Sequence, residues 1–350
     1  MISIHTSKVD NILSVVLKSD IDKFIQVREK SLGDLIDGKR AKKSTNGRSS
    51  KPKLLPKLTG KKLEYATLLK DNLSKIVLAH PSELTSWKNK FDAIISQLKI
   101  NDKIYKPFKN QILSCLDYEG LRSDFYPQYF SSLGIKSCVY CNALLTVSVE
   151  STITWMTPQR KQVKTKKEWK AKFQVDHYIP KSDYPCFGIS FYNLYPVCGP
   201  CNNIKLDRVI GFMLYLEGSI EFEDSPFLFE LEDGCVSSYL NTNNIELIKF
   251  RFLDNNNLYQ IKDSVGKTRA LFDIQGIYDT QKDVIAELIL KAKKYPTSYK
   301  ESLINSFSGL FSDASLSNRL LIGNYSQPSE IHNRPLAKFT QDIAKQLKLI

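Results

Sequence analysis

Asp176 and His177 are adjacent in the segment VDHYIPKS, residues 175–182, of a chain that has only four histidines. An imidazole exchanges a proton near neutral pH, so His177 is a candidate general base. The carboxylate of Asp176 and the amide of Asn202 offer hard oxygen atoms, which suit Mg²⁺ or Mn²⁺. A base beside such an ion could activate water to cleave a phosphodiester. A histidine next to an acid is often an ordinary pair, so its context must decide.

Four cysteines flank this pair in two Cys-x-x-Cys motifs, CVYC at 138–141 and CGPC at 198–201. Two such motifs are typical of a tetrahedral zinc, because each motif turns two sulfurs towards the same ion. Two unrelated thiol pairs, or a redox pair, are the alternatives. Four thiolates leave no open coordination position, so we expect the Zn²⁺ to be structural. Its predicted ligands are Cys138, Cys141, Cys198 and Cys201.

Two strands and a helix are expected to position these groups. The alternating, β-branched stretch 143–156 and the alternating stretch 167–177 predict strands, and helical periodicity follows the second cysteine motif. The predicted order is therefore strand, strand, helix, with the basic segment 157–166 between the two strands.

The adjacency of Asp176 and His177 poses a geometric problem for a shared active site. Neighbouring residues of a regular strand point to opposite faces of the sheet. Both side chains can serve one phosphate only if the strand ends or bulges there. Pro180, three residues after His177, favours an end to the strand.

The flanks of this unit predict mostly helix. Helical spacing of apolar residues covers 8–37 and resumes from about residue 63. Between them, segment 38–62 contains ten Lys or Arg and no acid, which is typical of a flexible basic linker. The fold class is therefore α+β. The predicted regions are a helical N-terminal region 1–130 with its linker 38–62, a cysteine-stapled core 131–216, and a mixed, then helical C-terminal region 217–350.

The chain carries a formal net charge of +13, from 50 basic and 37 acidic residues. An excess of this size indicates a polyanionic partner, and nucleic acid is the first candidate. The basic segment between the predicted strands would extend beside the candidate site, where clustered cations commonly contact the nucleic-acid backbone. The residues expected to make this contact are Arg160, Lys161, Lys164, Lys166 and Lys167.

Hydropathy argues against a membrane protein. The chain is 42% hydrophobic and 25% charged, and it has no apolar run of the roughly 18 residues that a spanning helix needs. Its first residues lack the basic start and apolar core of a signal peptide. We therefore expect a cytoplasmic protein without a membrane partner.

The segments CVYC, VDHYIPKS and YNLYPVCGPCNNIK, in this order, resemble the HNH endonucleases, the ββα-metal or His-Me finger group, in the form with an additional Cys₄ zinc. The resemblance covers about residues 138–208. It implies a ββα-metal core between helical flanks and hydrolysis of DNA phosphodiester bonds, with RNA not excluded. It also implies catalytic Mg²⁺ or Mn²⁺ besides the structural Zn²⁺.

The same resemblance implies roles for the polar residues within the motifs. His177 corresponds to the general base and Asp176 to a ligand of the catalytic metal. Asn193 corresponds to the middle asparagine of the family, a catalytic-site residue that braces the loop or orients the base.

Asn202 stands where many members of the family have their last histidine. An asparagine at this place occurs in Mg²⁺-dependent members and implies a metal ligand. Asn203 and Asn142 are the alternatives for this role. Lys205 follows Asn202 by three residues and so lies on the same helix face, where we expect it to touch phosphate.

The layout of the whole chain is similar to stand-alone bacterial HNH proteins that are encoded with an ATPase partner in anti-phage systems such as Septu. This similarity implies a role in antiviral defence together with a partner ATPase. The alternative is a zinc-stapled nucleic-acid-binding module, or a subunit of a complex, that is catalytically silent alone.

Overall fold

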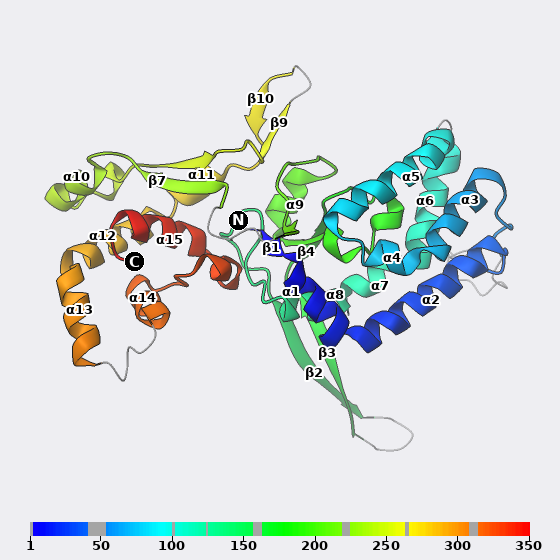
Figure 1. The fold of residues 1–350 in the computed structure, drawn as a ribbon, viewed down its shortest axis with the longest axis horizontal. Helices are drawn as coiled ribbons and strands as arrows, with labels where there is room; N and C mark the ends of the chain where they lie inside the picture. Colours follow the sequence, from blue (N-terminus) through cyan, green and yellow to red (C-terminus); the bar gives the residue numbers. More distant parts are fainter. Residues whose placement is uncertain are drawn as a thin grey trace.

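The computed structural model describes residues 3–40, 54–99, 102–123, 125–156, 163–218, 225–262, 266–307 and 314–350. The N-terminal helices lie on one side of a central segment that contains both cysteine motifs, and the C-terminal region lies on the other side (Figure 1). Within the described residues the strands form five two-stranded sheets. Mixed helix and strand agree with the predicted α+β class.

The N-terminal region consists mostly of helices. Helix α1 (Thr6–Asn11) continues through a π-helical turn, η1 (Ile12–Val16), into α2 (Lys18–Ile36). The helices that follow are α3 (Gly60–Asp71), α4 (Leu73–Val77), α5 (Pro81–Lys99), α6 (Asp102–Leu116), α7 (Tyr118–Ser123) and α8 (Phe125–Ser132).

Only part of the predicted basic linker 38–62 can be compared with the structure, since residues 41–53 lie outside the described segments of the chain. Its last residues are helical, because α3 already begins at Gly60. Helix α5 buries Phe91, Ile94 and Leu98 on one face, as helical spacing of apolar residues requires.

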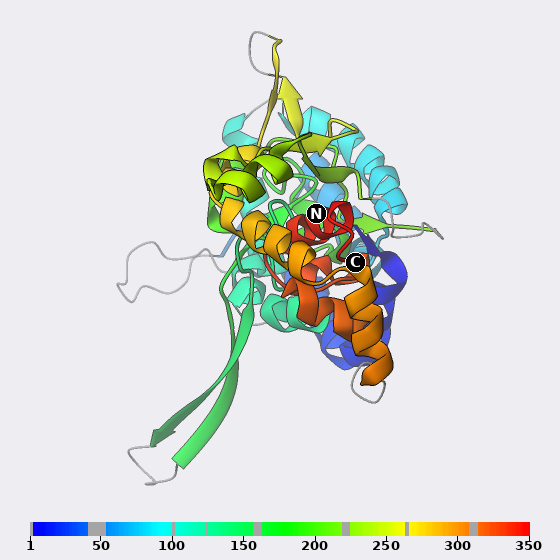
Figure 2. The ribbon, with the colours of Figure 1, turned by 90° about the vertical axis from the view of Figure 1, so that its left-hand side faces the viewer.

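Strands β2 (Ser148–Met156) and β3 (Val163–Ala171) form a long antiparallel ribbon that extends away from the body of the molecule (Figure 2). The prediction of one second strand over 167–177 is wrong. Strand β3 ends at Ala171, and residues Gln174–His177 form a separate strand, β4, which pairs with a different strand. Apolar and polar side chains alternate without interruption through this stretch. The pattern therefore does not show that the chain leaves one sheet and joins another.

The unit that carries the candidate site consists of β4, β5 (Leu194–Val197) and α9 (Gly199–Lys205). Strand β4 pairs antiparallel with β5, so that Asp176 lies opposite Tyr195 and His177 opposite Leu194. Two short 3₁₀ turns, η2 (Pro185–Phe187) and η3 (Phe191–Asn193), lie in the connection. The predicted order of two strands and a helix is wrong, because the four strands β2 to β5 precede α9, and the pair next to this helix is β4–β5 rather than the ribbon β2–β3.

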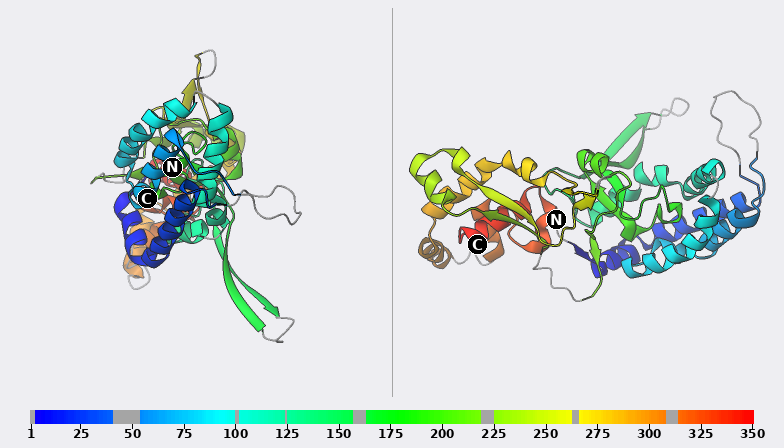
Figure 3. Two further views of the ribbon diagram at one scale, coloured as in Figure 1. Left: turned by 90° about the vertical axis from the view of Figure 1, so that its right-hand side faces the viewer. Right: turned by 90° about the horizontal axis from the view of Figure 1, so that it is seen from above.

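The start of the N-terminal region and the end of the central segment meet in a small parallel sheet. Strand β1 (Ile4–His5) pairs with β6 (Tyr215–Leu216), which follows α9. The N-terminal residues are therefore attached to the end of the central segment, and Figure 3 shows the N-terminus near the middle of the molecule.

The C-terminal region combines two further hairpins with helices. Strand β7 (Phe227–Leu231) pairs with β8 (Phe250–Asp254), and β9 (Gln260–Lys262) pairs with β10 (Thr268–Ala270). These hairpins give the region the mixed character that was expected of its first part. The remaining elements are α10 (Cys235–Thr242), η4 (Ile245–Leu247), α11 (Ile274–Asp279), α12 (Lys282–Lys294), α13 (Thr297–Ser306), α14 (Ala314–Ile322), η5 (Pro328–Asn333) and α15 (Ala337–Gln346).

Candidate metal centre and active site

The two cysteine motifs come together as predicted. All four Sγ atoms lie within 4.8 Å of one another, and all four residues are buried. Tetrahedral zinc with bonds of about 2.3 Å would place its sulfurs about 3.8 Å apart, and the Sγ atoms of Cys141 and Cys198 are 4.0 Å apart. Hydrogen bonds from the other three thiols lower the pKa of Cys141. The cluster can hold a metal ion such as zinc.

The backbone fixes both motifs as tight turns around the cluster. The amide of Cys198 donates to Cys138 Sγ at 3.3 Å, and the amide of Ala143 donates to Cys141 Sγ at 3.5 Å. The second motif also starts α9, since Cys198 is its N-cap. A metal ion at this cluster would therefore fix the start of α9 against the segment that leads into β2.

Asp176 is held from two sides. Its Oδ2 accepts a hydrogen bond from the Tyr140 hydroxyl at 2.6 Å and lies 2.9 Å from Lys205 Nζ. Burial and the negative charge of Asp176 raise the pKa of Tyr140, so the hydroxyl remains a donor. Among the described residues, Asp176 Oδ1 has no hydrogen-bond partner, and it is not sealed from solvent. One carboxylate oxygen thus remains for a ligand.

Lys205 does not take the place predicted for it. Its side chain is 0% exposed, and Nζ contacts Asp176 and donates to the backbone oxygen of His177 at 3.0 Å. The expectation that Lys205 touches phosphate is therefore wrong for this structure, because the face of α9 that carries it packs against β4. Lys205 does share a face of α9 with Asn202, as its spacing predicted, but this face packs against β4 and does not point towards solvent.

His177 points to the other face of β4, towards the loop between η2 and η3. Its Nε2 lies 3.1 Å from the carbonyl oxygen of Gly188, which can only accept, so Nε2 carries the hydrogen. Within the described residues no hydrogen bond engages Nδ1, and this atom is not sealed from solvent. The ring therefore keeps one nitrogen able to accept a proton.

The surroundings of His177 keep the imidazole neutral. Burial, followed by the positive charge of Lys181, lowers the pKa of His177 to about 3. The Tyr118 ring lies 5.2 Å from the imidazole, and Lys181 Nζ lies 4.7 Å from the centre of the Tyr118 ring. A neutral imidazole with a fixed tautomer can accept a proton at Nδ1, but this low pKa makes it a weaker base than the near-neutral value that suits a general base.

Asn193 braces the loop that carries Gly188. Its Oδ1 accepts from the amide of Ile179 at 2.7 Å, and its Nδ2 donates to the carbonyl oxygens of Ile179 and Phe187 at 3.0 and 3.1 Å. The buried amide thus joins the two ends of the turn opposite His177. These contacts are those of a side chain that braces the loop, which is the role expected for Asn193.

Asn202 lies on α9, facing β4. Its Nδ2 donates to Gln174 Oε1 at 2.6 Å, which leaves the amide oxygen of Asn202 for another partner. Gln174 and Asp176 are two residues apart in β4 and so share a face. The hard oxygen atoms of Asp176 and Asn202 therefore belong to the same side of the β4–β5–α9 unit.

The two alternatives to Asn202 have other surroundings. Asn142 is fully buried and has a positive φ of 53°. Its side chain donates to Ser137 Oγ at 2.7 Å and accepts from the amide of Lys338 at 3.0 Å. Asn142 is therefore a structural link to the C-terminal region. Asn203 is exposed on α9.

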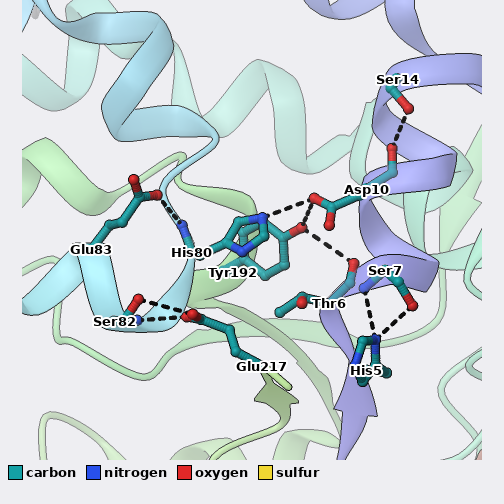
Figure 4. A network of polar contacts seen from close by, with 10 residues as sticks. All are labelled: His5, Thr6, Ser7, Asp10, Ser14, His80, Ser82, Glu83, Tyr192 and Glu217. Carbon is teal, nitrogen blue, oxygen red and sulfur yellow. Dashed lines mark hydrogen bonds and ion pairs between the residues drawn. The ribbon is translucent and has the colours of Figure 1, made fainter. Parts of the chain in front are cut away.

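A second polar network supports the same loop from the N-terminal helices (Figure 4). Asp10 Oδ1 accepts from the Tyr192 hydroxyl at 2.5 Å and lies 2.9 Å from His80 Nε2. The rings of His80 and Tyr192 are 4.8 Å apart. Because Tyr192 immediately precedes Asn193, this network ties α1 and the start of α5 to the candidate site.

The basic residues of the ribbon are only partly described. Arg160 and Lys161 lie outside the described residues, and Lys164 is placed within β3 by its backbone. Lys166 and Lys167 are exposed, with acidic neighbours at 3.6 Å (Glu168) and 3.2 Å (Glu150). Such exposed pairs are weak and do not prevent contact with a polyanion.

Several residues that surround the candidate site are not among those expected from the sequence. Tyr140 lies between the two cysteines of the first motif, and this position could have indicated it. Gln174 lies two residues before Asp176 in a strand, so the alternation of side chains could have placed it on the same face. Gly188 and Tyr118 could not be found in this way, since tertiary packing brings them to His177. Lys181 belongs to the same segment as His177, but the sequence alone does not show that its charge acts on the imidazole.

Comparison of the chain with protein-family models, with curated proteins and with solved structures finds no match. The interpretation of the site therefore depends on its geometry and on the motifs themselves. Across the residues that the structure describes, no helix combines the length and the apolar character needed to cross a bilayer.

Proposed function

We propose that this chain is a metal-dependent HNH endonuclease that hydrolyses DNA phosphodiester bonds. His177 serves as the general base, Asp176 and Asn202 hold Mg²⁺ or Mn²⁺, and the four cysteines hold a structural Zn²⁺. The partner ATPase and the role in antiviral defence remain predictions from the layout of the sequence.

The observation that carries the proposal is the hydrogen bond from His177 Nε2 to the Gly188 carbonyl oxygen. It fixes the tautomer in which Nδ1 is the nitrogen that accepts a proton. A histidine that served packing alone would not need a loop braced by Asn193 to present one carbonyl group to its ring.

In the proposed reaction, Nδ1 of His177 takes a proton from a water molecule as its oxygen attacks phosphorus. The bond between phosphorus and the leaving oxygen breaks, and this oxygen departs with the electron pair. The resulting imidazolium is next to the carbonyl of Gly188, which continues to accept from Nε2. Asn193 is a positioning residue, because it acts through the loop.

The donor atoms fit the proposed metal ions in their chemistry. A carboxylate and an amide oxygen suit Mg²⁺, and four buried thiols suit Zn²⁺. When bound, the divalent ion at Asp176 and Asn202 supplies stabilisation of negative charge on the phosphate. The pair with Lys205 places a positive charge beside the same carboxylate and so weakens the attraction for a cation.

This pair also favours the second candidate function, a nucleic-acid-binding subunit that is silent alone. Asp176 is only 5% exposed and already has a buried cationic partner. A rearrangement of α9 against β4, driven by substrate or by another protein, would free more of the carboxylate. Cleavage that depends on a second protein would distinguish this candidate.

The test is incubation of the purified chain with supercoiled plasmid in Mg²⁺, Mn²⁺ or EDTA. We expect relaxed or linear product with either ion and none in EDTA. His177→Ala should lose at least about 100-fold in rate, because base catalysis contributes this much, while DNA affinity stays unchanged. His5→Ala, which removes a histidine outside the site, is the matched control.

The metal ligands should fail in a different way. Asp176→Asn and Asn202→Ala should weaken binding of the divalent ion, so that high Mg²⁺ or Mn²⁺ partly restores cleavage, whereas His177→Ala stays inactive. Full activity of His177→Ala would overturn the assignment of the base. A wild-type chain that binds DNA but never cuts it would favour the silent subunit.

A further inference from the structure

The hairpin β9–β10 is a second ribbon that projects from the molecule (Figure 1). Its described residues are exposed, apart from the half-buried Ile261. By sequence, segment 260–270 carries three basic residues and one acid, Asp263, which lies outside the described residues. The basic residues are Lys262, Lys267 and Arg269.

Two cations of this hairpin are available to a partner. Lys262 and Arg269 form no ion pair with any described residue. The register pairs Lys262 with Thr268 and Arg269 with Ile261, so the two charges lie on opposite faces of the ribbon. An isolated two-stranded ribbon is only marginally stable in water, which suits a segment that is completed by binding.

The root of the hairpin is fixed to the candidate site. The hydroxyl of Tyr259, directly before β9, donates to the Tyr140 carbonyl oxygen at 2.9 Å. Tyr140 in turn donates through its own hydroxyl to Asp176 at 2.6 Å. The amide of Gly211 donates to the Leu258 carbonyl oxygen at 2.9 Å. The hairpin therefore has a defined position relative to Asp176 and α9.

The two ribbons extend in opposite directions from the segment that contains β4 and α9, both in Figure 1 and in Figure 2. One ribbon is β2–β3, whose lysines were expected to contact DNA. A substrate long enough to reach both ribbons would pass the candidate site between them.

We propose that β9–β10 is a second nucleic-acid-binding arm, in which Lys262 and Arg269 contact the phosphate backbone of duplex DNA on the side of the candidate site away from β2–β3. This inference rests on the proposed function. A protein partner fits the hairpin less well, since the centre of a protein interface is apolar, and the described residues of the hairpin expose no large apolar side chain.

The experiment measures the affinity for a duplex of about 40 base pairs at several salt concentrations in EDTA, so that no cleavage occurs. The variant is Lys262→Gln together with Arg269→Gln. The matched control is Lys293→Gln together with Lys294→Gln, which removes the same charge from exposed positions on α12. A thermal melt of each variant shows that the exposed substitutions leave the fold intact.

Two lost phosphate contacts should reduce the slope of log affinity against log salt by about 1.8, since each contact contributes about 0.9. At 0.1 M salt this corresponds to an affinity weaker by tens of fold. The control should keep the wild-type slope. The inference is overturned if the hairpin variant keeps this slope, or if the control loses as much of it.

This result is separate from the outcome of the plasmid assay. A chain that cuts plasmid but whose slope is insensitive to the hairpin variant keeps the nuclease proposal and loses the second arm. A chain that never cuts, yet shows the reduced slope, keeps the arm and loses the nuclease proposal. Absence of duplex binding by the wild-type chain would overturn the arm.

Discussion

The pair between Lys205 and Asp176 is the most buried ion pair of the candidate site, with side chains that are 0% and 7% exposed. Lys205 also donates to the backbone oxygen of His177. A single side chain of α9 thus fixes two adjacent residues of β4. Its removal would leave the carboxylate of Asp176 buried with only the Tyr140 hydroxyl as a partner.

We therefore expect Lys205→Met to lower the free energy of unfolding by about 3–5 kcal/mol, the usual effect of removing one member of a buried pair. Lys167→Met is the matched control, because Lys167 is 70% exposed and its pair with Glu150 contributes at most about 1 kcal/mol. Urea denaturation measures both. Equal effects of the two substitutions would show that Lys205 is not buried as described.

The neutral state of His177 has a consequence for stability against pH. Because the folded protein lowers the pKa of His177 to about 3, the unfolded chain binds one more proton than the folded chain between about pH 6.5 and pH 3. The free energy of unfolding should therefore fall as pH falls through this window. Above pH 6.5 both states are neutral and the contribution is constant.

The comparison with His177→Gln isolates this effect, measured without added divalent ion. From pH 7.5 to pH 5, the wild type should lose about 2 kcal/mol more stability than the variant, since each pH unit below 6.5 corresponds to about 1.4 kcal/mol. Other acid-sensitive groups cancel in the difference. A difference in stability that stays constant over this range would contradict a neutral, buried His177.

At the scale of elements, the ribbon β2–β3 should bind DNA without reading its sequence. Replacing Lys164, Lys166 and Lys167 with Glu should weaken binding to every duplex and flatten its salt dependence, because fewer counterions are released. Filter binding with several unrelated sequences measures the change. Weakened binding of one sequence alone would instead make the ribbon a reader of bases.

The cysteine motifs and the Asp-His pair could be predicted because their chemistry is local. A Cys-x-x-Cys turn presents two sulfurs whatever surrounds it, and the end of β4 at His177 agrees with the expected end of a strand before Pro180. The end of the strand does not bring the two side chains to one face, since Asp176 turns to α9 and His177 turns to Gly188. The proposed action of both on one phosphate therefore requires a rearrangement around β4.

The pairing of strands could not be predicted from the same pattern. Alternation of side chains runs through 167–177 without a break, although β3 pairs with β2 and β4 pairs with β5. Choice of partner depends on contacts between segments that are distant in sequence. The position of Lys205 could not be predicted for the same reason. Helical spacing predicts the face of α9 on which Lys205 lies, but not the segment against which this face packs.

At the scale of the whole molecule, the first cysteine motif joins the central segment to the C-terminal region. The Tyr278 hydroxyl donates to the Cys141 carbonyl oxygen at 2.8 Å, and Lys338 donates its amide to Asn142. The amide of Leu336 donates to the Asn142 carbonyl oxygen at 2.6 Å. Residues far apart in sequence thus depend on the conformation of this turn.

We expect one zinc per chain and a loss of structure that spreads from the cluster when the metal is removed. Cys198→Ser should lower the melting temperature and lose the metal, because metal binding contributes to the folding free energy. Cys235→Ser, at a buried cysteine outside the cluster, should keep one zinc. Metal analysis and a thermal melt measure both variants.

Hydrogen exchange then shows how far the loss of metal extends. Chelation should increase exchange in α9 and in α11, which carries Tyr278, before it affects α5, since within the described residues α5 makes no hydrogen bond to either cysteine motif. Protein purified without chelator that contains no zinc would contradict a zinc site. Uniform exchange across α5 and α11 after chelation would contradict the link between the first cysteine motif and the C-terminal region.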